Sequence, residues 1–411
     1  MKPRLIVCSE LYYPDESATG YLLTRIAEGL SEDFAVRVLC GFPTNKGGRA
    51  ERREERNGVT IERCASTRFD KNVVIPRSIN VLTVTLSIFW KAMRQIRAKD
   101  SVLVVTNPPT LPFAAWAACW FRRARCYLLI HDVYPEVLIV TGLVRPSSLL
   151  ARVLGWCHRK LYRNMDVIIV LGRDMHRLVM RKVQPSEPHI ALITNWADLE
   201  EIVPSPRKKN RFLEKLDLND KFVIQYSGNL GRTHGVELIL EAAKLLREDP
   251  TVHFLVIGSG AKKEWLEEGV RRERLANVTL LPPQRRPELP DVLNACDVAL
   301  ISFVPSMAGV SVPSRMYNIM AAGKPIIAAA DVGSEIALVV NEERIGWLIP
   351  PGRPDMLVET LQRAKLDSEG LREMGRRARA AAEREYGLDK VLASYRTLLG
   401  SASVQPGLPG F

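Results

Sequence analysis

Residues 313–325 read PSRMYNIMAAGKP and follow an apolar run and a glycine-containing loop. Ser314 can cap a helix, and Gly323 can end it with Pro325 just beyond, so the stretch predicts a short helix that leads into a strand. Arg315 then falls in the first helical turn, where the helix dipole is positive and disfavours a cation. We therefore expect a bound anion there, such as a nucleotide phosphate, unless Arg315 bends away into solvent.

Apolar runs typical of buried strands alternate with helical patterns on both sides of this stretch. Strands that are apolar throughout need cover on both faces, so the alternation indicates parallel sheets between layers of helices. Prolines at 204 and 206 and three successive cations at 207–209 mark a linker between two such series. We expect strands at residues 5–8, 36–40, 59–64, 102–106, 126–130, 167–171 and 190–194, and then at 222–226, 254–257, 278–281, 298–301, 326–329 and 347–349.

The fold class expected is therefore α/β, with two Rossmann-like, doubly wound domains of similar size. We place the first domain in residues 1–200 and the second in residues 201–385. Residues 386–411 are expected to continue a long final helix that packs back on the first domain and to end in a frayed tail from Gly400.

The positive charge is concentrated in the first domain. The chain carries a formal net charge of +12; residues 1–200 hold 29 Lys and Arg against 19 Asp and Glu, whereas the remaining residues hold 29 against 27. Such asymmetry predicts a polyanionic partner for the first half, either nucleic acid or an anionic membrane.

Two apolar and aromatic runs in this half end in basic clusters. Residues 79–90 are followed by Lys91, Arg94, Arg97 and Lys99, and residues 111–121 by Arg122, Arg123 and Arg125. Neither run reaches the roughly 20 residues that span a bilayer. The pattern favours helices that lie in a membrane interface, while helices that merely cover one face of a sheet are the alternative.

The seven cysteines are scattered and contain no Cys-x-x-Cys pair. Most of them lie in apolar runs, which indicates reduced, buried thiols in a cytosolic protein without disulfides or zinc. We also expect no signal peptide, because the first apolar run is too short for one.

Several loops follow predicted strands of the first half, where ligands bind in doubly wound folds. The loop at 12–21 precedes a helix and contains Tyr13, Thr19 and Gly20, and the segment at 130–136 contains His131, Asp132 and Glu136. A histidine beside a carboxylate at a strand end is a candidate site, although a structural histidine is the alternative. The segment NWAD at 195–198 fits either a site or an ordinary turn.

The loops of the second half are rich in glycine. Residues 226–236 read YSGNLGRTHGV and form the first strand-to-helix turn there, so backbone atoms can approach a phosphate or sugar closely. Gly258 and Gly260 follow the next strand, where a tight turn without a ligand is an equal alternative. Gln284 follows the third strand and could read a base edge. The candidate residues of the glycine-rich turn are Gly228, Asn229, Gly231, Arg232 and His234.

In combination, these loops resemble the retaining glycosyltransferases of family 4, which have the GT-B fold of two Rossmann-like domains facing each other across a cleft. The resemblance covers nearly the whole chain and rests on the loops at 12–20, 131–136, 195–198, 227–235, 258–260 and 313–325. The segments HDVYPE and NWAD look like those of a bacterial branch that makes capsule, exopolysaccharide and O-antigen chains, including the colanic-acid and fucosamine transferases.

The resemblance implies transfer of a sugar, with retention of configuration, from a nucleotide diphosphate sugar (a UDP-sugar is favoured) to a polyprenyl-diphosphate-linked glycan. It implies no cofactor, no metal and no nucleic acid, and a place at the inner face of the plasma membrane. His131 and Asp132 would be catalytic, and Tyr13, Thr19 and Glu136 would face the acceptor. The donor would be bound by Gly20, Gly228, Asn229, Gly231, Arg232, His234, Gly258, Gly260, Gln284, Ser314, Arg315 and Asn318.

The chain departs from the family pattern in two places. Many members hold the donor diphosphate with Arg and Lys where this chain has Asn229 and His234. Many also carry two glutamates eight positions apart, which align here near Val310 and with Asn318. We expect Arg315 to supply the missing charge for the diphosphate.

Two other functions remain open at this point. A nucleotide-sugar 2-epimerase shares the GT-B fold but needs acidic groups for proton transfer, which the missing glutamates disfavour. A basic nucleic-acid-binding protein fits the charge of the first half, but its cations follow apolar runs and do not interleave with aromatic residues.

Overall fold

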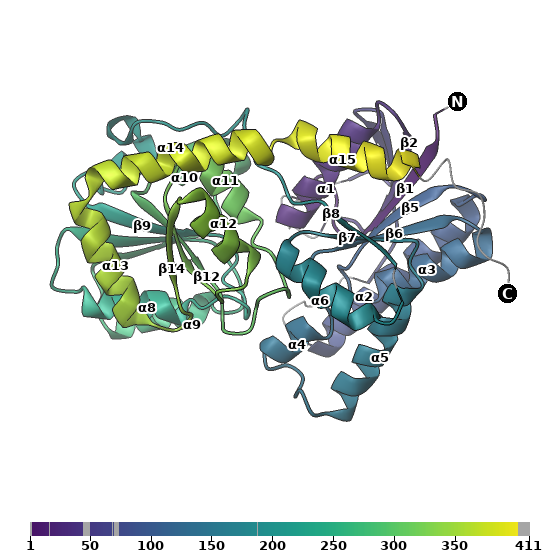
Figure 1. Cartoon of the computed structure of the whole chain (residues 1–411), viewed down its shortest axis with the longest axis horizontal. Helices are drawn as coiled ribbons and strands as arrows, with labels where there is room; N and C mark the ends of the chain where they lie inside the picture. The colour runs from purple at the N-terminus through teal and green to yellow at the C-terminus, as the bar shows by residue number, and fades with distance from the viewer. Residues whose placement is uncertain are drawn as a thin grey trace.

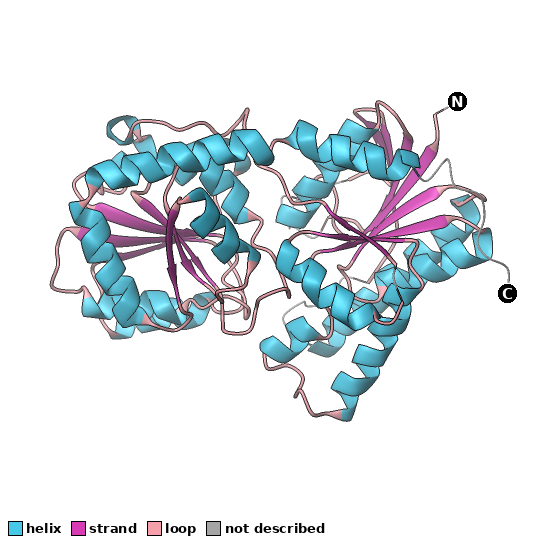
Figure 2. Cartoon of the chain, viewed as in Figure 1, coloured by secondary structure: helices cyan, strands magenta, loops and turns pink. Residues whose placement is uncertain are grey.

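The computed structural model describes residues 2–401 except 16, 44–49, 68, 70–73 and 187. These residues form two α/β halves, each with a central sheet between helices (Figures 1 and 2). The frayed tail was predicted from Gly400, but residues 400 and 401 still belong to the last helix, and the rest of the predicted tail lies outside the described residues. No helix in the described part is both long and apolar enough to cross a bilayer.

The sheet of the first half has the order β3-β4-β2-β1-β5-β6-β7-β8, and its strands are parallel except for β3, which runs antiparallel to β4. Its central strands are buried along most of their length, as their continuous apolar sequences predict. The strands are β1 (Arg4–Ser9), β2 (Ala35–Cys40), β3 (Arg53–Arg56), β4 (Val59–Arg63), β5 (Ser101–Val105), β6 (Arg125–Ile130), β7 (Val167–Val170) and β8 (His189–Leu192).

Helices cover both faces of this sheet. On one side α2 packs against α3, α3 against α5 and α5 against α6, while α1 packs against the C-terminal helix α15 on the other. The helices are α1 (Ala18–Leu30), α2 (Val74–Gln95), α3 (Leu111–Arg122), α4 (Glu136–Val140), α5 (Leu149–Arg163), α6 (Arg173–Val183) and α15 (Leu388–Ser401).

The second sheet is parallel throughout, with the order β11-β10-β9-β12-β13-β14. Separate apolar clusters lie on its two faces, one under α8, α9 and α13 and the other under α10, α11, α12 and α14. Its elements are α7 (Arg211–Lys215), β9 (Phe222–Ser227), α8 (Glu237–Leu245), β10 (Val252–Ile257), α9 (Lys263–Arg272), β11 (Val278–Leu281), α10 (Leu289–Asn294), β12 (Val298–Ser302), α11 (Arg315–Ala321), β13 (Ile326–Ala329), α12 (Glu335–Glu343), β14 (Gly346–Ile349), α13 (Pro354–Leu366) and α14 (Ser368–Glu385).

Two expectations from the sequence were incomplete or wrong. Strand β3, with the sequence REER, was missed because an exposed edge strand needs no apolar pattern. The predicted side-chain cap by Ser314 is not formed. The backbone of Ser314 already has helical angles (φ −59°, ψ −25°) instead of the extended angles from which a serine hydroxyl reaches back to the first turn. Gly323 follows the helix with φ +62°, as expected.

The chain passes between the halves twice, and the two passages are joined. The backbone N–H of Ala197 donates to the carbonyl of Tyr386 at 2.7 Å, and Ala197 forms a parallel bridge with Gly387. Helix α15 then lies against α1, where Arg396 pairs with Asp33 at 2.6 Å. The final helix therefore belongs to the layers of the first sheet.

The start of α6 forms a second connection to the other half. Arg173 pairs with Glu335 at 3.1 Å. The buried carboxylate of Asp174 accepts the backbone N–H groups of Gly309, at 2.7 Å, and Glu335, at 3.0 Å. This contact fixes the loop that precedes residues 313–325 against the first half.

Candidate functional site

A short backbone pairing brings the His131 segment to the Arg315 segment. The backbone N–H of Val133 donates to the carbonyl of Val310 at 2.9 Å, and Asp132 forms an antiparallel bridge with Ser311. Helix α11 starts four residues after Ser311. Two candidate regions that are far apart in the sequence therefore meet at the boundary between the halves.

Arg315 turns toward the glycine-rich turn and does not extend into solvent. Its Cζ lies 4.5 Å from the ring centroid of Tyr226, and its Nη1 lies 3.4 Å from the carbonyl oxygen of Ser227. A Cβ atom on Gly228 would lie 2.9 Å from the same Nη1, and Gly228 has φ +148°. Glycine is thus required at this position both by its backbone and by the guanidinium beside it. Arg315 has no acidic partner in the described part of the chain.

The rest of the turn supplies free backbone donors. The N–H groups of His234 and Gly235 are already bonded, to the carbonyls of Gly231 and Ser302. The backbone N–H groups of residues 231–233 have no hydrogen-bond partner in the part that the structure describes. A cation and a row of free N–H groups on a glycine-rich turn form a suitable environment for a phosphate.

His234 is neutral and packed. Its ring stacks on Phe303, with centroids 5.4 Å apart. Burial, and then the charges of Arg315 and Lys262, lower the pKa of His234 well below its usual value. Residue 234 therefore does not replace the missing lysine charge.

Lys262 is a nearby cation that the sequence analysis missed. Its Nζ donates to the carbonyl of His234 at 2.8 Å and pairs with Glu237 at 2.7 Å. The signal that could have identified it is its place two residues after Gly260, at the start of α9.

Several of the candidate glycines are explained by loop packing. A Cβ atom on Gly258 would lie 1.9 Å from the carbonyl oxygen of Gly228, and one on Gly260 would lie 2.5 Å from Oδ1 of Asn229. The two glycine turns thus lie directly against each other. Gly20 has a local explanation, because a Cβ there would lie 2.9 Å from the carbonyl oxygen of Asp15.

His131 carries an unused polar atom. Its backbone N–H donates to Oγ1 of Thr106 at 3.0 Å. Its Nε2 is buried and has no hydrogen-bond partner among the described residues. Burial lowers the pKa of His131 to about 4, so the imidazole is neutral near pH 7. Burial also raises the pKa of Asp132, against the opposing effect of a hydrogen bond with Ser311.

Other predicted residues lie in contacts of their own. Glu136 pairs with Lys182 of α6 at 2.5 Å, and the ring of Tyr13 lies under Arg56, 3.9 Å from Cζ to the centroid. Nε2 of Gln284 donates to the carbonyl of Pro282, at 2.7 Å. The structure does not bring these side chains to Arg315. Thr19 lies in the first turn of α1 and is partly exposed, and Arg232 is exposed.

Asn318 takes part in a cluster between the halves. Its Oδ1 accepts the backbone N–H of Asp198 at 3.0 Å. The carboxylate of Asp198 in turn accepts Tyr21 Oη at 2.8 Å and Arg286 Nη2 at 2.7 Å. The guanidinium of Arg286 lies 3.1 Å above the ring of Tyr21. The amide of Asn318 therefore connects α11 to the segment at 195–198. No local pattern in the sequence had indicated that Tyr21 and Arg286 take part in this cluster.

The described residues contain no group of three or more His, Cys, Asp or Glu side chains that could hold a metal ion. All seven cysteines are free thiols, and six of them are buried. The chemistry available at the site is therefore that of Arg315, Lys262, His131, Asp132 and backbone N–H groups.

Comparisons with known proteins identify the family. Residues 207–381 match the family described as Glycosyl transferases group 1, and residues 19–196 match the Glycosyl transferase 4-like domain. WbjE of Pseudomonas aeruginosa, a probable glycosyltransferase, is 30% identical over 98% of this chain and 100% of its own length. WcaI of Escherichia coli K12, a putative colanic acid biosynthesis glycosyl transferase, is 26% identical over 95% of this chain and 98% of its own length.

Solved structures share the whole architecture. HepE of Anabaena in complex with UDP and glucose gives a TM-score of 0.74 at 16% identity, with 97% of this chain and 100% of that chain covered. Sucrose-phosphate synthase from Thermosynechococcus elongatus gives 0.78 at 17% identity, with the same coverage. These likenesses confirm the predicted GT-B fold. With two matching domains and a relative aligned along its entire length, the chain belongs to the family 4 glycosyltransferases.

Proposed function

We propose that the protein transfers a sugar from a UDP-sugar, with retention of configuration, to a lipid-linked glycan during bacterial surface polysaccharide synthesis. The observation that carries this proposal is the position of Arg315, which has no acidic partner among the described residues and lies against Gly228 beside free backbone N–H groups. Such a site suits the diphosphate of a nucleotide sugar. Membership in a glycosyltransferase family favours a transferase over the two alternatives, an epimerase and a nucleic-acid-binding protein.

Two relatives support the choice of donor and pathway. HepE, which has the same fold, was solved with UDP and glucose, which favours a uridine donor. WcaI, which aligns over nearly its whole length, is described by its role in colanic acid biosynthesis, which favours a surface polysaccharide product.

In the proposed mechanism, negative charge develops on the diphosphate as the sugar–phosphate bond breaks. Arg315 and the N–H groups of residues 231–233 stabilise that charge, with Lys262 close to the same turn. The leaving phosphate accepts the proton of the acceptor hydroxyl, so the proposal needs no pair of catalytic carboxylates and no metal. The neutral imidazole of His131 contacts a hydroxyl of the donor sugar or of the acceptor in this proposal.

The acceptor is proposed to lie at an anionic membrane surface, on the cytoplasmic side. The neighbouring helices α2, α3 and α5 of the first half present large exposed apolar side chains. The sequence analysis did not identify α5, because its apolar residues are spread among basic ones. Exposed aromatic side chains beside cations are typical of interfacial binding. These side chains are Ile79, Leu82, Leu86 and Trp90 on α2, Trp120 and Phe121 on α3, and Leu149, Leu150, Val153 and Trp156 on α5.

Replacing Arg315 by Ala is predicted to lower kcat/KM for the UDP-sugar by roughly 10²- to 10³-fold, because one preorganised donor to the developing charge is lost. Arg315→Lys should recover part of this activity, since the charge remains without the planar fork. Arg271→Ala, which removes an exposed arginine of α9 in the same half, is the matched control. An unchanged kcat/KM for the UDP-sugar in a folded Arg315→Ala variant would contradict the proposed role.

Replacing His131 by Ala is predicted to lower kcat by roughly 5- to 150-fold, the range expected for one lost hydrogen bond in the transition state. His189→Ala removes an exposed histidine and should leave kcat unchanged. Near wild-type turnover of a folded His131→Ala variant would make His131 a structural residue.

The same histidine has a consequence for stability. Its pKa is about 4 in the folded protein against 6.5 for an unperturbed histidine, so the unfolded chain binds the proton first as the pH falls. The contribution of neutral His131 to the free energy of unfolding is therefore complete above about pH 6.5 and is lost between pH 6.5 and 4. Denaturation curves measured between pH 4 and 6.5 should show that the free energy of unfolding depends less steeply on pH in His131→Ala than in the wild type.

The membrane proposal predicts sedimentation with vesicles that contain anionic phospholipid and little with neutral vesicles, because each basic residue near an anionic leaflet adds about 1 kcal/mol. Trp120→Ser combined with Trp156→Ser should weaken this binding. The control Trp265→Ser, which changes an exposed tryptophan of α9, should not. Equal behaviour with both kinds of vesicle would argue for a soluble acceptor.

A further inference from the structure

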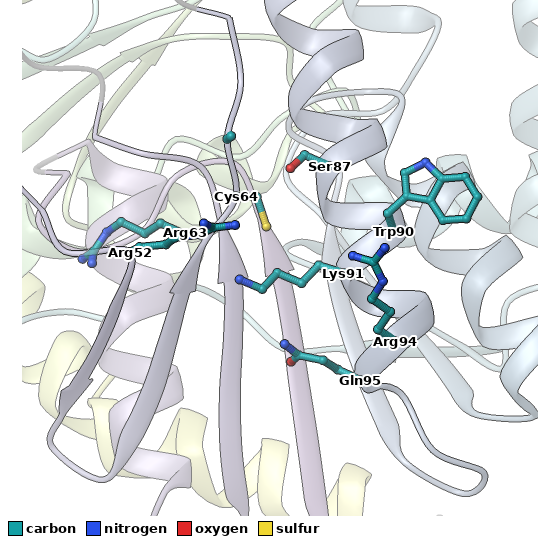
Figure 3. A pocket seen from close by; sticks show the side chains of 9 residues that line it. Arg52, Arg63, Cys64, Ser87, Trp90, Lys91, Arg94 and Gln95 are labelled. Carbon is teal, nitrogen blue, oxygen red and sulfur yellow. The ribbon is translucent and has the colours of Figure 1, made fainter.

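A cavity of about 560 Å³ lies outside the site described above, between the end of β4 and one flank of α2 (Figure 3). Its lining includes four cations, Arg52, Arg63, Lys91 and Arg94, together with the exposed Trp90. In Figure 3, Lys91 and Gln95 extend from the helix toward the strand ends, where Arg63 and Cys64 lie. So many cations around one hollow require a physical explanation.

Neighbouring acids compensate only half of this charge. Lys91 pairs with Glu62 at 2.8 Å, and Arg63 pairs with Glu54 at 2.8 Å. Arg52 and Arg94 have no side-chain partner in the described part of the chain. Burial raises the pKa of Cys64 to about 11, so its thiol stays neutral and adds no negative charge. Among the described residues, two positive charges at the cavity are thus left without a counter-charge.

Arg63 lines the cavity and is fully buried. Its guanidinium donates to the carbonyls of Glu51, at 2.6 Å, and Tyr13, at 2.9 Å, while its Nε has no partner in the described residues. The bond to Tyr13 joins the cavity to the loop after β1, which the sequence analysis placed on the acceptor side.

An apolar stripe leads to the cavity. Ile79, Leu82, Leu86 and Trp90 are all exposed and recur at helical spacing along one side of α2. Trp90 is the last of them and also lines the cavity. A cationic hollow at the end of an exposed apolar stripe matches a ligand with an anionic head and a hydrocarbon tail.

We propose that this cavity binds the diphosphate of an isoprenyl-diphosphate-linked acceptor and that the isoprenyl chain lies along the α2 stripe. The assignment rests on the lipid-linked acceptor of the proposed function. It adds the place and the groups that hold the lipid. Arg52 and Arg94 bind the phosphates, and Trp90 packs on the first isoprene unit. A second UDP-sugar would leave the stripe unused.

Direct binding of farnesyl diphosphate to the full chain tests the assignment, with calorimetry as the readout. Inorganic pyrophosphate and farnesol serve as separate arms that present the head and the tail alone. The proposal predicts that farnesyl diphosphate binds at least tenfold more tightly than either. Equal affinity for pyrophosphate, or for farnesol, would overturn the assignment of an amphiphile.

Charge reversal locates the site. Arg94→Glu and Arg52→Glu should each weaken farnesyl diphosphate binding roughly tenfold or more and leave the affinity for UDP unchanged. Arg97→Glu is the control: Arg97 is an exposed cation just beyond α2 that does not line the cavity, and its replacement changes the charge by the same amount. This variant should bind farnesyl diphosphate like the wild type. Equal losses in Arg94→Glu and Arg97→Glu would overturn the assignment, because they would mean non-specific attraction.

The assay needs no turnover, so it separates the two proposals. Specific farnesyl diphosphate binding in a protein that fails to transfer sugar would uphold the cavity assignment and contradict the proposed function. Sugar transfer to a lipid-linked acceptor that is unaffected by Arg52→Glu and Arg94→Glu would uphold the function and overturn the cavity assignment.

Discussion

The guanidinium of Arg315 and the backbone of Gly228 lie so close that no side chain fits between them. This contact depends on three layers of structure. The glycine turns after β9 and β10 pack on each other, α11 positions Arg315 at its first residue, and the pairing of residues 310–311 with 132–133 holds this region against the first half. An alanine at Gly228 would displace the guanidinium that faces the turn.

The same boundary includes a position at which the chain departs from the pattern of the family. Asn318 stands where an acid is usual, and its Oδ1 accepts the N–H of Asp198. The carboxylate of Asp198 in turn accepts hydrogen bonds from Tyr21 and Arg286. His234 is packed on Phe303 beside Lys262, and its pKa lies well below the usual value, so it carries no positive charge near pH 7.

Much of the fold could be predicted because continuous apolar strands and glycine or proline stops are local signals. Strands β11 and β13 were predicted with their observed bounds, and the other expected strands lie within a few residues of theirs. The edge strand β3 has no apolar pattern, and its pairing depends on β4. At the candidate site, sequence reasoning named Arg315, Gly228 and His131, and the structure places Arg315 against Gly228. Sequence reasoning could not find Lys262, Arg286 or Tyr21, because their roles arise only when distant loops meet.

A crystal structure of the protein with UDP would test the proposed role of Arg315. We expect a diphosphate oxygen at about 3 Å from the guanidinium of Arg315, beside Gly228 and the N–H groups of residues 231–233. A diphosphate bound elsewhere, with Arg315 still on the carbonyl of Ser227, would contradict it.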